Sequence, residues 1–291
     1  MKLLGVIGDP IEHSLSPELF DYLFKSLQVE CRYDPYRVSP DGLEDFVRTS
    51  RLGGLLGFNV TIPHKESIIP FLDDVAEDAR RLGAVNTVVN TDGKGMVGHN
   101  TDLDGFLNPL RERNLSLVGQ HAVVLGAGGA ARAVVHGLGK LDAAHITVAN
   151  RTEARARTLT DALDSSLSVD AYALDDPALA ESLRQARLLV NATSVGMHPH
   201  DDTSPLDPTE ALLHEDLIVY DLVYRPLETQ LLADAAAHNA DPIDGLEMLI
   251  GQALQALRLW LPEGPAVSWS LRDELRAYLR GKLLDDGNAA E

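Results

Sequence analysis

The stretch Val123-Val124-Leu125-Gly126-Ala127-Gly128-Gly129-Ala130-Ala131 decides the fold of this chain. A short apolar run leads directly into a Gly-x-Gly-x-x-Ala turn, which is typical of the strand–turn–helix unit that binds a dinucleotide. Gly126 permits the tight turn, Gly128 lets backbone amides approach a pyrophosphate, and Ala131 lets the helix pack closely on the strand. The helix N-terminus then presents its positive dipole end to the phosphates. The pattern predicts a domain for a nicotinamide or flavin cofactor.

A second apolar run at residues 144–149 ends at Asn150-Arg151-Thr152, about twenty residues after the first glycine of the turn. An acidic residue there would accept hydrogen bonds from a ribose 2′-hydroxyl and would repel a 2′-phosphate. The chain instead carries Arg151 and, one helical turn later, Arg155. Arginine binds phosphate through two parallel hydrogen bonds, so we predict NADP(H) rather than NAD. The alternative is that these arginines only solvate a helix, which would leave the missing acid unexplained.

The length and composition of the chain limit the classes of protein to which it can belong. The 291 residues are enough for about two domains with substantial cores, and 45% of them are hydrophobic and 24% charged, as in an ordinary globular protein. The sequence opens with a strand-like segment at residues 2–7, and no apolar stretch approaches the ~20 residues that span a bilayer. The single cysteine, Cys31, excludes an internal disulfide and a cysteine-based zinc cluster. We therefore expect a cytoplasmic protein that neither enters a membrane nor is exported.

The formal net charge is −19, from 44 acidic and 25 basic residues. A surface this acidic repels a nucleic-acid backbone, so nucleic acid is not expected as a partner. The acidity has two interpretations, which the sequence leaves open: simple solubility, or life in a salt-rich cytoplasm where the excess charge is screened. A salt titration of stability and activity would separate them.

Hydrophobic periodicity predicts two α/β domains. Before the glycine turn, short apolar strands alternate with helical stretches, and the same alternation continues to about residue 240, with buried parallel strands at 188–191 and 217–221. The tail is helical at 246–261 and 271–284, where apolar residues recur every three or four positions. We predict a first α/β domain at 1–104, a Rossmann-type dinucleotide domain at 105–245, and a helical segment at 246–291 that packs back on the first domain. Strands are expected at 3–8, 33–38 and 55–61, and helices near 17–27, 43–48 and up to Leu82.

Polar clusters at the strand ends of the first domain indicate a binding site. In the loop at 9–17, Ser16 is expected to cap a helix that Pro17 opens, but capping does not explain Ser14. The run Asn59-Val60-Thr61-Ile62-Pro63-His64-Lys65 is expected to end a strand and open a helix, with Lys65 in its first turn. A lysine there faces the positive end of the helix dipole, which lowers a lysine pKa and suits proton transfer.

Two further clusters, at 84–89 and 96–102, flank Asp92-Gly93-Lys94-Gly95, which predicts a hairpin. Folding about that turn sets Asn86 nearly opposite Thr101 and Asp102. Each cluster taken alone is better explained as a cap, a turn or a solvated surface. All of them at strand ends of one domain favour a site in a crevice.

Taken together, these motifs resemble the shikimate dehydrogenase family, whose members reduce 3-dehydroshikimate in the aromatic amino acid pathway. The resemblance covers nearly the whole chain and finds no departure in the substrate motifs. It is carried, in order, by Ser14-Leu15-Ser16-Pro17, Asn59-Val60-Thr61-Ile62-Pro63-His64-Lys65, Gly83-Ala84-Val85-Asn86-Thr87, Asn100-Thr101-Asp102, Gly126-Ala127-Gly128-Gly129-Ala130, Asn150-Arg151-Thr152, Asn191-Ala192-Thr193-Ser194-Val195-Gly196-Met197, Asp221-Leu222-Val223-Tyr224-Arg225-Pro226 and Gly245-Leu246-Glu247-Met248-Leu249-Ile250-Gly251-Gln252.

The resemblance implies an NADP-dependent oxidoreductase with Lys65 and Asp102 as the catalytic pair, and with chemistry in a cleft between the domains. It implies that the substrate is surrounded by Ser14, Ser16, Thr61, Lys65, Asn86, Asp102, Tyr224 and Gln252. For the cofactor, it places the pyrophosphate at Gly126, Ala127, Gly128, Gly129 and Ala130, the adenosine 2′-phosphate at Asn150, Arg151, Thr152 and Arg155, and the nicotinamide end near Leu222 and Gly245. It also puts Glu77 near the nicotinamide ribose, although an exposed helix carboxylate is an equally good interpretation of that residue.

Three alternatives compete with this function. A metal site is not expected, because His198-Pro199-His200-Asp201 is the tightest group among ten histidines and has no third ligand at a fixed spacing. His13 and His64 flank substrate motifs and are expected to be structural.

An NAD-linked quinate/shikimate dehydrogenase and a non-catalytic relative that senses NADP or a metabolite remain open. Arg151 and Arg155 argue against NAD, and the Lys65–Asp102 pair argues against a pure binder. The oligomeric state is expected to be monomer or homodimer.

Overall fold

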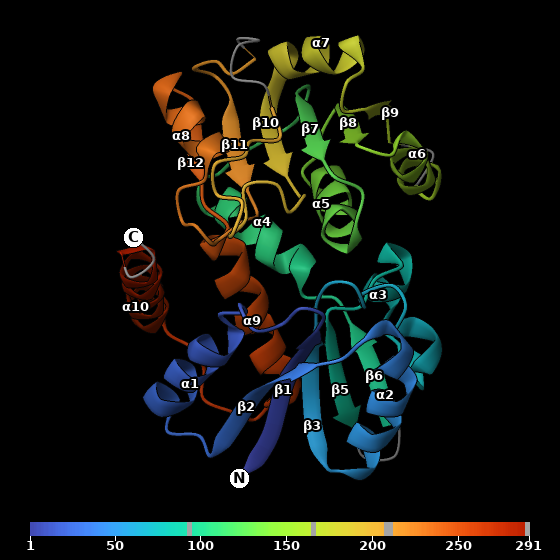
Figure 1. Ribbon diagram of the computed structural model, residues 1–291, viewed down its shortest axis with the longest axis vertical. Helices are drawn as coiled ribbons and strands as arrows, with labels where there is room; N and C mark the ends of the chain where they lie inside the picture. The colour runs from blue at the N-terminus through green and yellow to red at the C-terminus, as the bar shows by residue number, and fades with distance from the viewer. Residues whose placement is uncertain (92–94, 164–166, 207–211, 289–291) are drawn as a thin grey trace. The chain divides into compact units, whose positions relative to one another are not determined.

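The computed structural model describes residues 1–91, 95–163, 167–206 and 212–288, and the chain divides into two compact units (Figure 1). The first unit comprises Met1–Gly105 and Ile250–Gly281, and the second comprises Phe106–Leu249 together with the residues from Lys282 onward. Each unit is built on its own sheet of described strands, with helices beside it. The predicted α/β class with two domains is confirmed.

The first unit contains a six-stranded mixed sheet in the order β2-β1-β3-β5-β6-β4. The pairs β1–β2, β1–β3 and β4–β6 are parallel, whereas β3–β5 and β5–β6 are antiparallel. Its elements are β1 (Lys2–Gly8), α1 (Ser16–Leu27), β2 (Cys31–Arg37), the 3-10 turn η1 (Pro40–Gly42), α2 (Leu43–Leu52), β3 (Leu55–Val60), the 3-10 turn η2 (Ile69–Phe71), β4 (Asp74–Val75), α3 (Glu77–Leu82), β5 (Thr87–Thr91) and β6 (Gly95–His99). Helices α4 (Asp102–Glu112), α9 (Leu246–Trp260) and α10 (Trp269–Asn288) have residues in both units.

Aromatic rings cover one face of this sheet. The Phe20 ring of α1 stacks on Tyr33 of β2 with centroids 4.3 Å apart, and Trp260 of α9 lies 5.4 Å from Phe20. The Trp260 indole N–H donates to the Val88 carbonyl oxygen at 2.9 Å. Gly57 of β3 makes this approach possible, because a Cβ atom there would collide with both the indole nitrogen and the Val88 carbonyl. The opposite face packs on α2, where Phe46 meets Phe58 edge to face at 5.3 Å.

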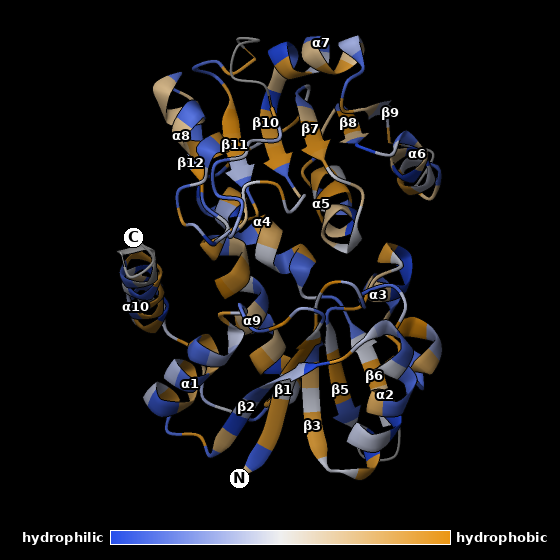
Figure 2. Ribbon diagram, viewed as in Figure 1, coloured by the Kyte–Doolittle hydropathy of each residue, from blue (hydrophilic) through white to orange (hydrophobic). Residues whose placement is uncertain are grey.

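The second unit contains a parallel sheet in the order β12-β11-β10-β7-β8-β9, which is the doubly wound arrangement expected of a dinucleotide domain. Figure 2 shows that the central strands β7, β10 and β11 are mainly hydrophobic, as strands buried on both faces must be. Its elements are β7 (His121–Leu125), α5 (Gly129–Lys140), β8 (His145–Asn150), α6 (Glu153–Asp161), β9 (Val169–Ala173), α7 (Pro177–Gln185), β10 (Ala186–Asn191), β11 (Ile218–Asp221), α8 (Gln230–Ala237) and β12 (Asp241–Ile243).

Apart from the helix expected at Lys65, the strand and helix predictions agree with these elements, and the paired strands β5 and β6 form the predicted antiparallel pair. The centre of the predicted hairpin, Asp92-Gly93-Lys94, lies outside the described residues. Among the helices that the structure describes, none is long and apolar enough to cross a bilayer.

The predicted helix at Lys65 is wrong. The chain turns after β3, and the next regular elements are the 3-10 turn at Ile69–Phe71 and α3, which starts only at Glu77. The Ile68 N–H does reach the His64 carbonyl at 3.0 Å, but Pro70 has no N–H with which to continue a helix. The helix dipole therefore has no part in the chemistry of Lys65.

The predicted cap at Ser16 is also wrong. Helix α1 begins at Ser16 itself, Leu15 occupies the capping position, and no side chain caps this helix. The Ser14 hydroxyl accepts the Ser16 N–H at 3.3 Å, so the first free amide of the helix is satisfied from two residues upstream. Ser14 and Ser16 are thus linked to each other, rather than one of them serving the helix alone.

Replacing Gly57 with alanine is expected to lower the free energy of unfolding by about 2 kcal/mol, since the added methyl group overpacks a site where Trp260 is held by a hydrogen bond. Urea unfolding measures the loss. Gly281→Ala in α10 is the matched control, because a Cβ atom there meets nothing within 4 Å and alanine favours a helix. Equal stability of Gly57→Ala and the unsubstituted chain would contradict the close packing described above.

Candidate active site

The Lys65 ammonium and the Asp102 carboxylate form a partly buried ion pair in the first unit. The Nζ atom lies 2.6 Å from Oδ2 of Asp102, and the two side chains are 16% and 5% exposed. Lys65 comes from the turn after β3, and Asp102 is the first residue of α4. Removing either partner from a pair this buried would leave an uncompensated charge, so each holds the other in place.

Asn86 holds the second oxygen of the same carboxylate. Its Nδ2 atom donates to Oδ1 of Asp102 at 2.7 Å, and its Oδ1 atom accepts the Thr101 backbone N–H at 2.7 Å. A backbone N–H can only donate and a carboxylate can only accept, so these two contacts decide which way the amide points. Asn86 directly precedes β5 and Thr101 follows β6, which confirms the predicted convergence across the hairpin.

The loop after β1, which leads to Ser14 and Ser16, and the loop after β3, which carries Thr61, are joined by backbone hydrogen bonds. The Thr61 N–H donates to the Ile7 carbonyl at 2.9 Å, and the Asp9 N–H donates to the Ile62 carbonyl at 3.0 Å. Because neighbouring parallel strands end at one edge of the sheet, both loops leave the same edge. Of the remaining candidates, Ser16 at the start of α1 and Gln252 on α9 are buried, and Ser14 is partly buried.

Two histidines, His64 and His99, lie near this edge. His64 is fully buried, with Nε2 2.6 Å from the Val38 carbonyl, so Nε2 carries the proton and Nδ1 has no partner. Its backbone anchors the turn that carries Lys65, since its carbonyl accepts the Ile68 N–H. Burial lowers the pKa of His99, and the more distant Asp74 only partly opposes that effect.

The glycine turn in the second unit has the geometry of a phosphate cradle. Gly126 has φ of +108°, and a Cβ atom there would approach the Ala192 carbonyl oxygen to 2.9 Å. Gly128 is the N-cap of α5, and a Cβ atom there would meet nothing within 4 Å. The first N–H groups of a helix have no intrahelical acceptor. This turn therefore presents free donors to open space, which fits a dinucleotide pyrophosphate.

The arginines after β8 are available for an anion. Asn150 ends the strand, its Nδ2 atom donates to the Thr152 carbonyl at 2.9 Å, and α6 follows. Arg157 on that helix pairs with Glu153, with 2.9 Å between Nε and Oε1. Within the described part of the chain, neither Arg151 nor Arg155 has an acidic partner, and both are exposed.

Leu222 and Gly245 lie against each other. A Cβ atom on Gly245 would come within 2.5 Å of the Leu222 carbonyl oxygen, so the loop after β11 and the start of α9 are in backbone contact. Tyr224, which belongs to the same loop as Leu222, is partly buried. The two residues predicted for the nicotinamide end are thus brought together.

Comparison with known proteins supplies the family. Residues 6–88 match the family described as "Shikimate dehydrogenase substrate binding domain", and residues 110–202 match "Shikimate / quinate 5-dehydrogenase". The chain is 42% identical to shikimate dehydrogenase (NADP(+)) of Nitrosopumilus maritimus, over 89% of this chain and 93% of that relative. This chain belongs to the shikimate dehydrogenase family.

Solved structures of relatives agree with this assignment. Shikimate 5-dehydrogenase of Thermus thermophilus, in complex with NADP(H) and shikimate, has a TM-score of 0.82 at 37% identity, covering 96% of this chain and 99% of that one. Quinate dehydrogenase of Corynebacterium glutamicum, in complex with NAD, also has a TM-score of 0.82, at 31% identity, covering 95% of this chain and 97% of that one. The two substrate and cofactor pairings therefore occur on one fold.

In this member of the shikimate dehydrogenase family, Glu77 and the pair of His198 and Asp201 are not among the contacts described above. Glu77 opens α3, where its side chain is 77% exposed and pairs with Arg81. His198 and Asp201 lie 3.4 Å apart, and the described residues contain no group of three or more His, Cys, Asp or Glu that could hold a metal ion.

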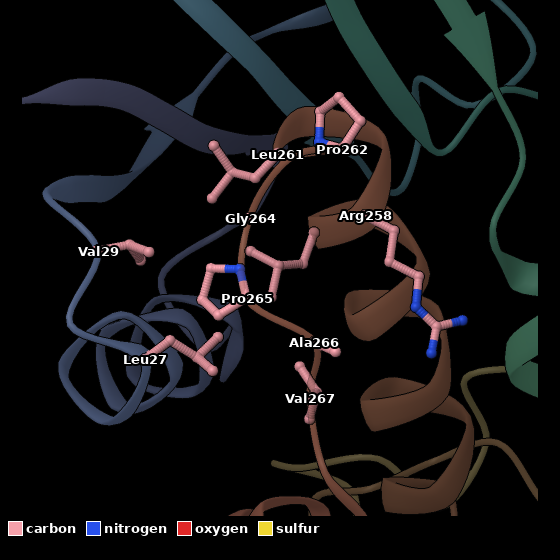
Figure 3. Close-up of a pocket in the computed structure, with 10 residues that line it drawn as sticks. Leu27, Val29, Arg258, Leu261, Pro262, Gly264, Pro265, Ala266 and Val267 are labelled. Carbon is pink, nitrogen blue, oxygen red and sulfur yellow. The ribbon is translucent and has the colours of Figure 1, made fainter.

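A pocket of about 170 Å³ lies in the first unit near the ends of α1 and α9. Figure 3 shows its lining side chains, most of which are apolar. None of the predicted site residues lines it. Its lining consists of Leu27, Val29, Leu257, Arg258, Leu261, Pro262, Gly264, Pro265, Ala266 and Val267.

Asp221 is a further functional candidate. It opens the motif Asp221-Leu222-Val223-Tyr224-Arg225-Pro226 but was not predicted as a site residue. It ends β11, is completely buried, and accepts hydrogen bonds from Asn191 Nδ2 at 2.9 Å, Thr229 Oγ1 at 2.7 Å and the Val223 N–H at 3.0 Å. One carboxylate thus ties β10, the loop after β11 and the N-cap of α8. Burial among neutral groups raises its pKa to about 6, although the three donors oppose the shift. The signal in the sequence that could have predicted this role is a charged residue at the end of an apolar strand.

Asp221→Asn is expected to change how stability depends on pH. The folded-state pKa lies above the ordinary value, so the contribution of Asp221 is present below pH 4 and is lost as the pH rises toward 6. The loss amounts to about 3 kcal/mol. Part of this loss has already occurred at pH 4, so between pH 4 and pH 7 the free energy of unfolding of the variant should rise by about 2 kcal/mol relative to the unsubstituted chain.

Urea unfolding followed by circular dichroism at pH 4, 5, 6 and 7 makes this measurement. Asp241→Asn, which removes an exposed carboxylate at the start of β12, is the control and should leave the profile unchanged. A constant difference between Asp221→Asn and the unsubstituted chain across these pH values would show that Asp221 does not titrate in this range.

Proposed function

We propose that this protein catalyses the reversible, NADP-linked reduction of 3-dehydroshikimate to shikimate, a step in the synthesis of aromatic amino acids. The observation that carries the proposal is the ion pair of Lys65 and Asp102, 2.6 Å apart, in a chain of this family. A ketone can be reduced only if its oxygen receives a proton as hydride reaches its carbon. A buried, oriented ammonium is suited to that task.

The polar residues of the first unit match the chemistry of the substrate. Shikimate carries several hydroxyl groups and one carboxylate, so its site needs short hydroxyl and amide groups that both donate and accept. A wrong substrate would leave such groups buried and unpaired, which costs binding energy and gives discrimination. We assign substrate binding to Ser14, Ser16, Thr61, Lys65, Asn86, Asp102 and Gln252 of this unit, and to Tyr224, which belongs to the second unit.

In the mechanism that we propose, Lys65 donates a proton to the substrate oxygen in the direction of reduction and stabilises the negative charge that develops there. Asp102 keeps the ammonium charged and oriented through the 2.6 Å contact. Asn86 fixes the carboxylate through its other oxygen, so that Asp102 cannot turn away from Lys65. In oxidation of shikimate the same groups act in reverse, and Lys65 receives the proton.

NADP(H), when bound, supplies or accepts the hydride. We assign its pyrophosphate to Gly126, Ala127, Gly128, Gly129 and Ala130, its 2′-phosphate to Asn150, Arg151, Thr152 and Arg155, and its nicotinamide end to Leu222 and Gly245. Open space at Gly128 and two arginines that have no acidic partner among the described residues support these assignments. The salt bridge between Glu77 and Arg81 gives no support to a role for Glu77 at the nicotinamide ribose, which stays a prediction.

The remaining predictions belong to the same proposal. We retain a substrate domain at 1–104, a cofactor domain at 105–245 and a returning segment at 246–291, together with a cytoplasmic location and a monomer or homodimer. Quinate with NAD is the second candidate pairing, because a relative of the same fold is a quinate dehydrogenase in complex with NAD.

Absorbance of reduced nicotinamide tests the function directly. The purified protein is offered shikimate or quinate with NADP or NAD. We expect turnover with shikimate and a strong preference for NADP. Quinate oxidation with NAD would replace the proposal with the second candidate, and bound NADP without turnover in any combination would indicate a sensor.

Lys65→Ala is expected to reduce kcat by about a thousandfold, because the proton donor is lost. Binding of NADPH, followed by the fluorescence of its reduced nicotinamide, should be unchanged. Lys25→Ala is the control, since Lys25 is an exposed lysine that pairs with Asp21 on α1. Substantial activity in Lys65→Ala would remove Lys65 from the proton-transfer step.

Arg151→Gln and Arg155→Gln are each expected to raise the KM for NADP by about ten- to a hundredfold, which is the usual effect of losing one charge-assisted hydrogen-bonded pair. The kcat/KM for NAD should stay the same, because NAD lacks the 2′-phosphate. The matched control is Arg157→Gln, because Arg157 is on α6 like Arg155 but already pairs with Glu153. Equal effects on NADP and NAD would contradict recognition of the 2′-phosphate.

A further inference from the structure

A continuous chain of buried hydrogen bonds runs from Tyr33 to the Asp102 carboxylate. The Tyr33 hydroxyl lies 2.6 Å from Asn59 Oδ1, and Asn59 Nδ2 lies 3.0 Å from Thr87 Oγ1. Thr87 Oγ1 is in turn 3.0 Å from Asn86 Oδ1, and Asn86 Nδ2 is 2.7 Å from Asp102 Oδ1. None of these side chains is more than 8% exposed, so water does not interrupt the chain.

The chain follows the order of the sheet. Tyr33 belongs to β2, Asn59 to β3 and Thr87 to β5, and β1 lies between the first two strands (Figure 1). In the register of the sheet, Tyr33 pairs with Leu4 and Asn59 pairs with Val6, two residues further along β1. Both side chains therefore lie on one face of the sheet, and Tyr33 is long enough to cross β1.

Backbone groups determine which way both amides of the chain point, while the Thr87 hydroxyl lies 3.0 Å from the Asn86 amide oxygen and 3.1 Å from the Thr101 hydroxyl. The Thr101 N–H donates to Asn86 at 2.7 Å, which makes that atom the amide oxygen and turns the Asn86 N–H toward Asp102. The Asn86 carbonyl accepts from Asn59 at 3.2 Å, which makes that atom the Asn59 nitrogen and turns its oxygen toward Tyr33. The Tyr33 hydroxyl must then donate.

All the donors consequently point toward the catalytic carboxylate. Hydrogen bonds arranged head to tail polarise one another, and the effect is strongest where water is excluded. The last donor, Asn86 Nδ2, acts on one oxygen of Asp102 while Lys65 acts on the other. Loss of the first donor weakens each later one and leaves the Asn59 amide oxygen without the hydrogen bond from Tyr33.

We propose that Tyr33 is a positioning residue for the reaction, whose hydroxyl strengthens the successive hydrogen bonds of Asn59, Thr87 and Asn86 and thereby helps to hold Asp102 against Lys65. The inference rests on the proposed function, since it assigns the Lys65–Asp102 pair to proton transfer. Tyr33 acts through other residues and touches neither Asp102 nor Lys65 in the chain of contacts. The Tyr33 ring has a separate role in packing. It stacks on Phe20 with centroids 4.3 Å apart, and this contact is kept when the hydroxyl is removed.

Tyr33→Phe tests the proposal, with Tyr36→Phe as the matched control. Tyr36 lies on the same strand and packs on Phe46, and its hydroxyl has no hydrogen-bond partner among the described residues. We expect Tyr33→Phe to lower kcat for shikimate oxidation by about three- to tenfold, the usual effect of one buried hydrogen bond. The KM for NADP should change less than twofold, and Tyr36→Phe should keep the kcat of the unsubstituted enzyme.

The primary isotope effect with shikimate deuterated at the reacting carbon separates positioning from structure. A slower chemical step makes hydride transfer more rate-limiting, so the isotope effect on kcat should rise in Tyr33→Phe. A mere loss of folded protein would lower the rate without changing the isotope effect. An unchanged kcat together with an unchanged isotope effect would overturn the proposal.

A double-mutant cycle with Thr87→Val completes the test. Valine breaks the chain between Asn59 and Asn86, so adding Tyr33→Phe to Thr87→Val should lower kcat by less than twofold further. Full additivity of the two effects on kcat would overturn the proposal. If Thr87→Val does not fold, the isotope effect of Tyr33→Phe alone decides. Absence of turnover in the unsubstituted enzyme would refute the proposed function instead, which keeps the two failures distinct.

Discussion

Burial of the Asp102 carboxylate is the constraint on which the first unit depends. A charged carboxylate this far from water costs several kcal/mol unless an opposite charge and hydrogen-bond donors surround it. Lys65 supplies the charge and Asn86 supplies a donor, and both come from other strand ends of the same sheet. The antiparallel pair β5–β6 brings Asn86 to Asp102, and the turn after β3 brings Lys65. The mixed topology of this sheet is therefore what allows a buried ion pair at its edge.

The second unit contains a buried carboxylate without a cation. Asp221 accepts three hydrogen bonds from neutral groups, and burial among them raises its pKa to about 6. The contrast with Asp102 is instructive, because the same side chain serves two purposes. Paired with Lys65, the carboxylate is held by an opposite charge at the edge of the sheet. Surrounded by neutral donors, it fastens the loop that carries Leu222 to the neighbouring strand and helix at a cost in stability near neutral pH.

Local patterns in the sequence predicted most of the strands and helices, and also the convergence of Asn86, Thr101 and Asp102, since a hairpin brings together residues close in sequence. Two errors arose where proline chemistry and a nearby side chain overrode the pattern. Pro70 prevented the helix expected at Lys65, and Ser14 satisfied the amide that Ser16 was expected to serve. The hydrogen bond from Tyr33 to Asn59 could not be predicted, because it crosses an intervening strand whose register no local pattern contains.

The distribution of charge bears independently on the cofactor. The chain has 44 acidic and 25 basic residues, and among its described residues at least eight arginines form an ion pair with a carboxylate, as Arg37 does with Asp9 and Arg48 with Asp45. Such exposed pairs contribute little to stability, but they show how readily a cation on this surface is neutralised. Arg151 and Arg155 follow β8 with no acidic partner among the described residues. Two such arginines at the strand end where this fold binds the adenosine ribose are what a second phosphate requires, because a nearby carboxylate would compete for the same guanidinium donors.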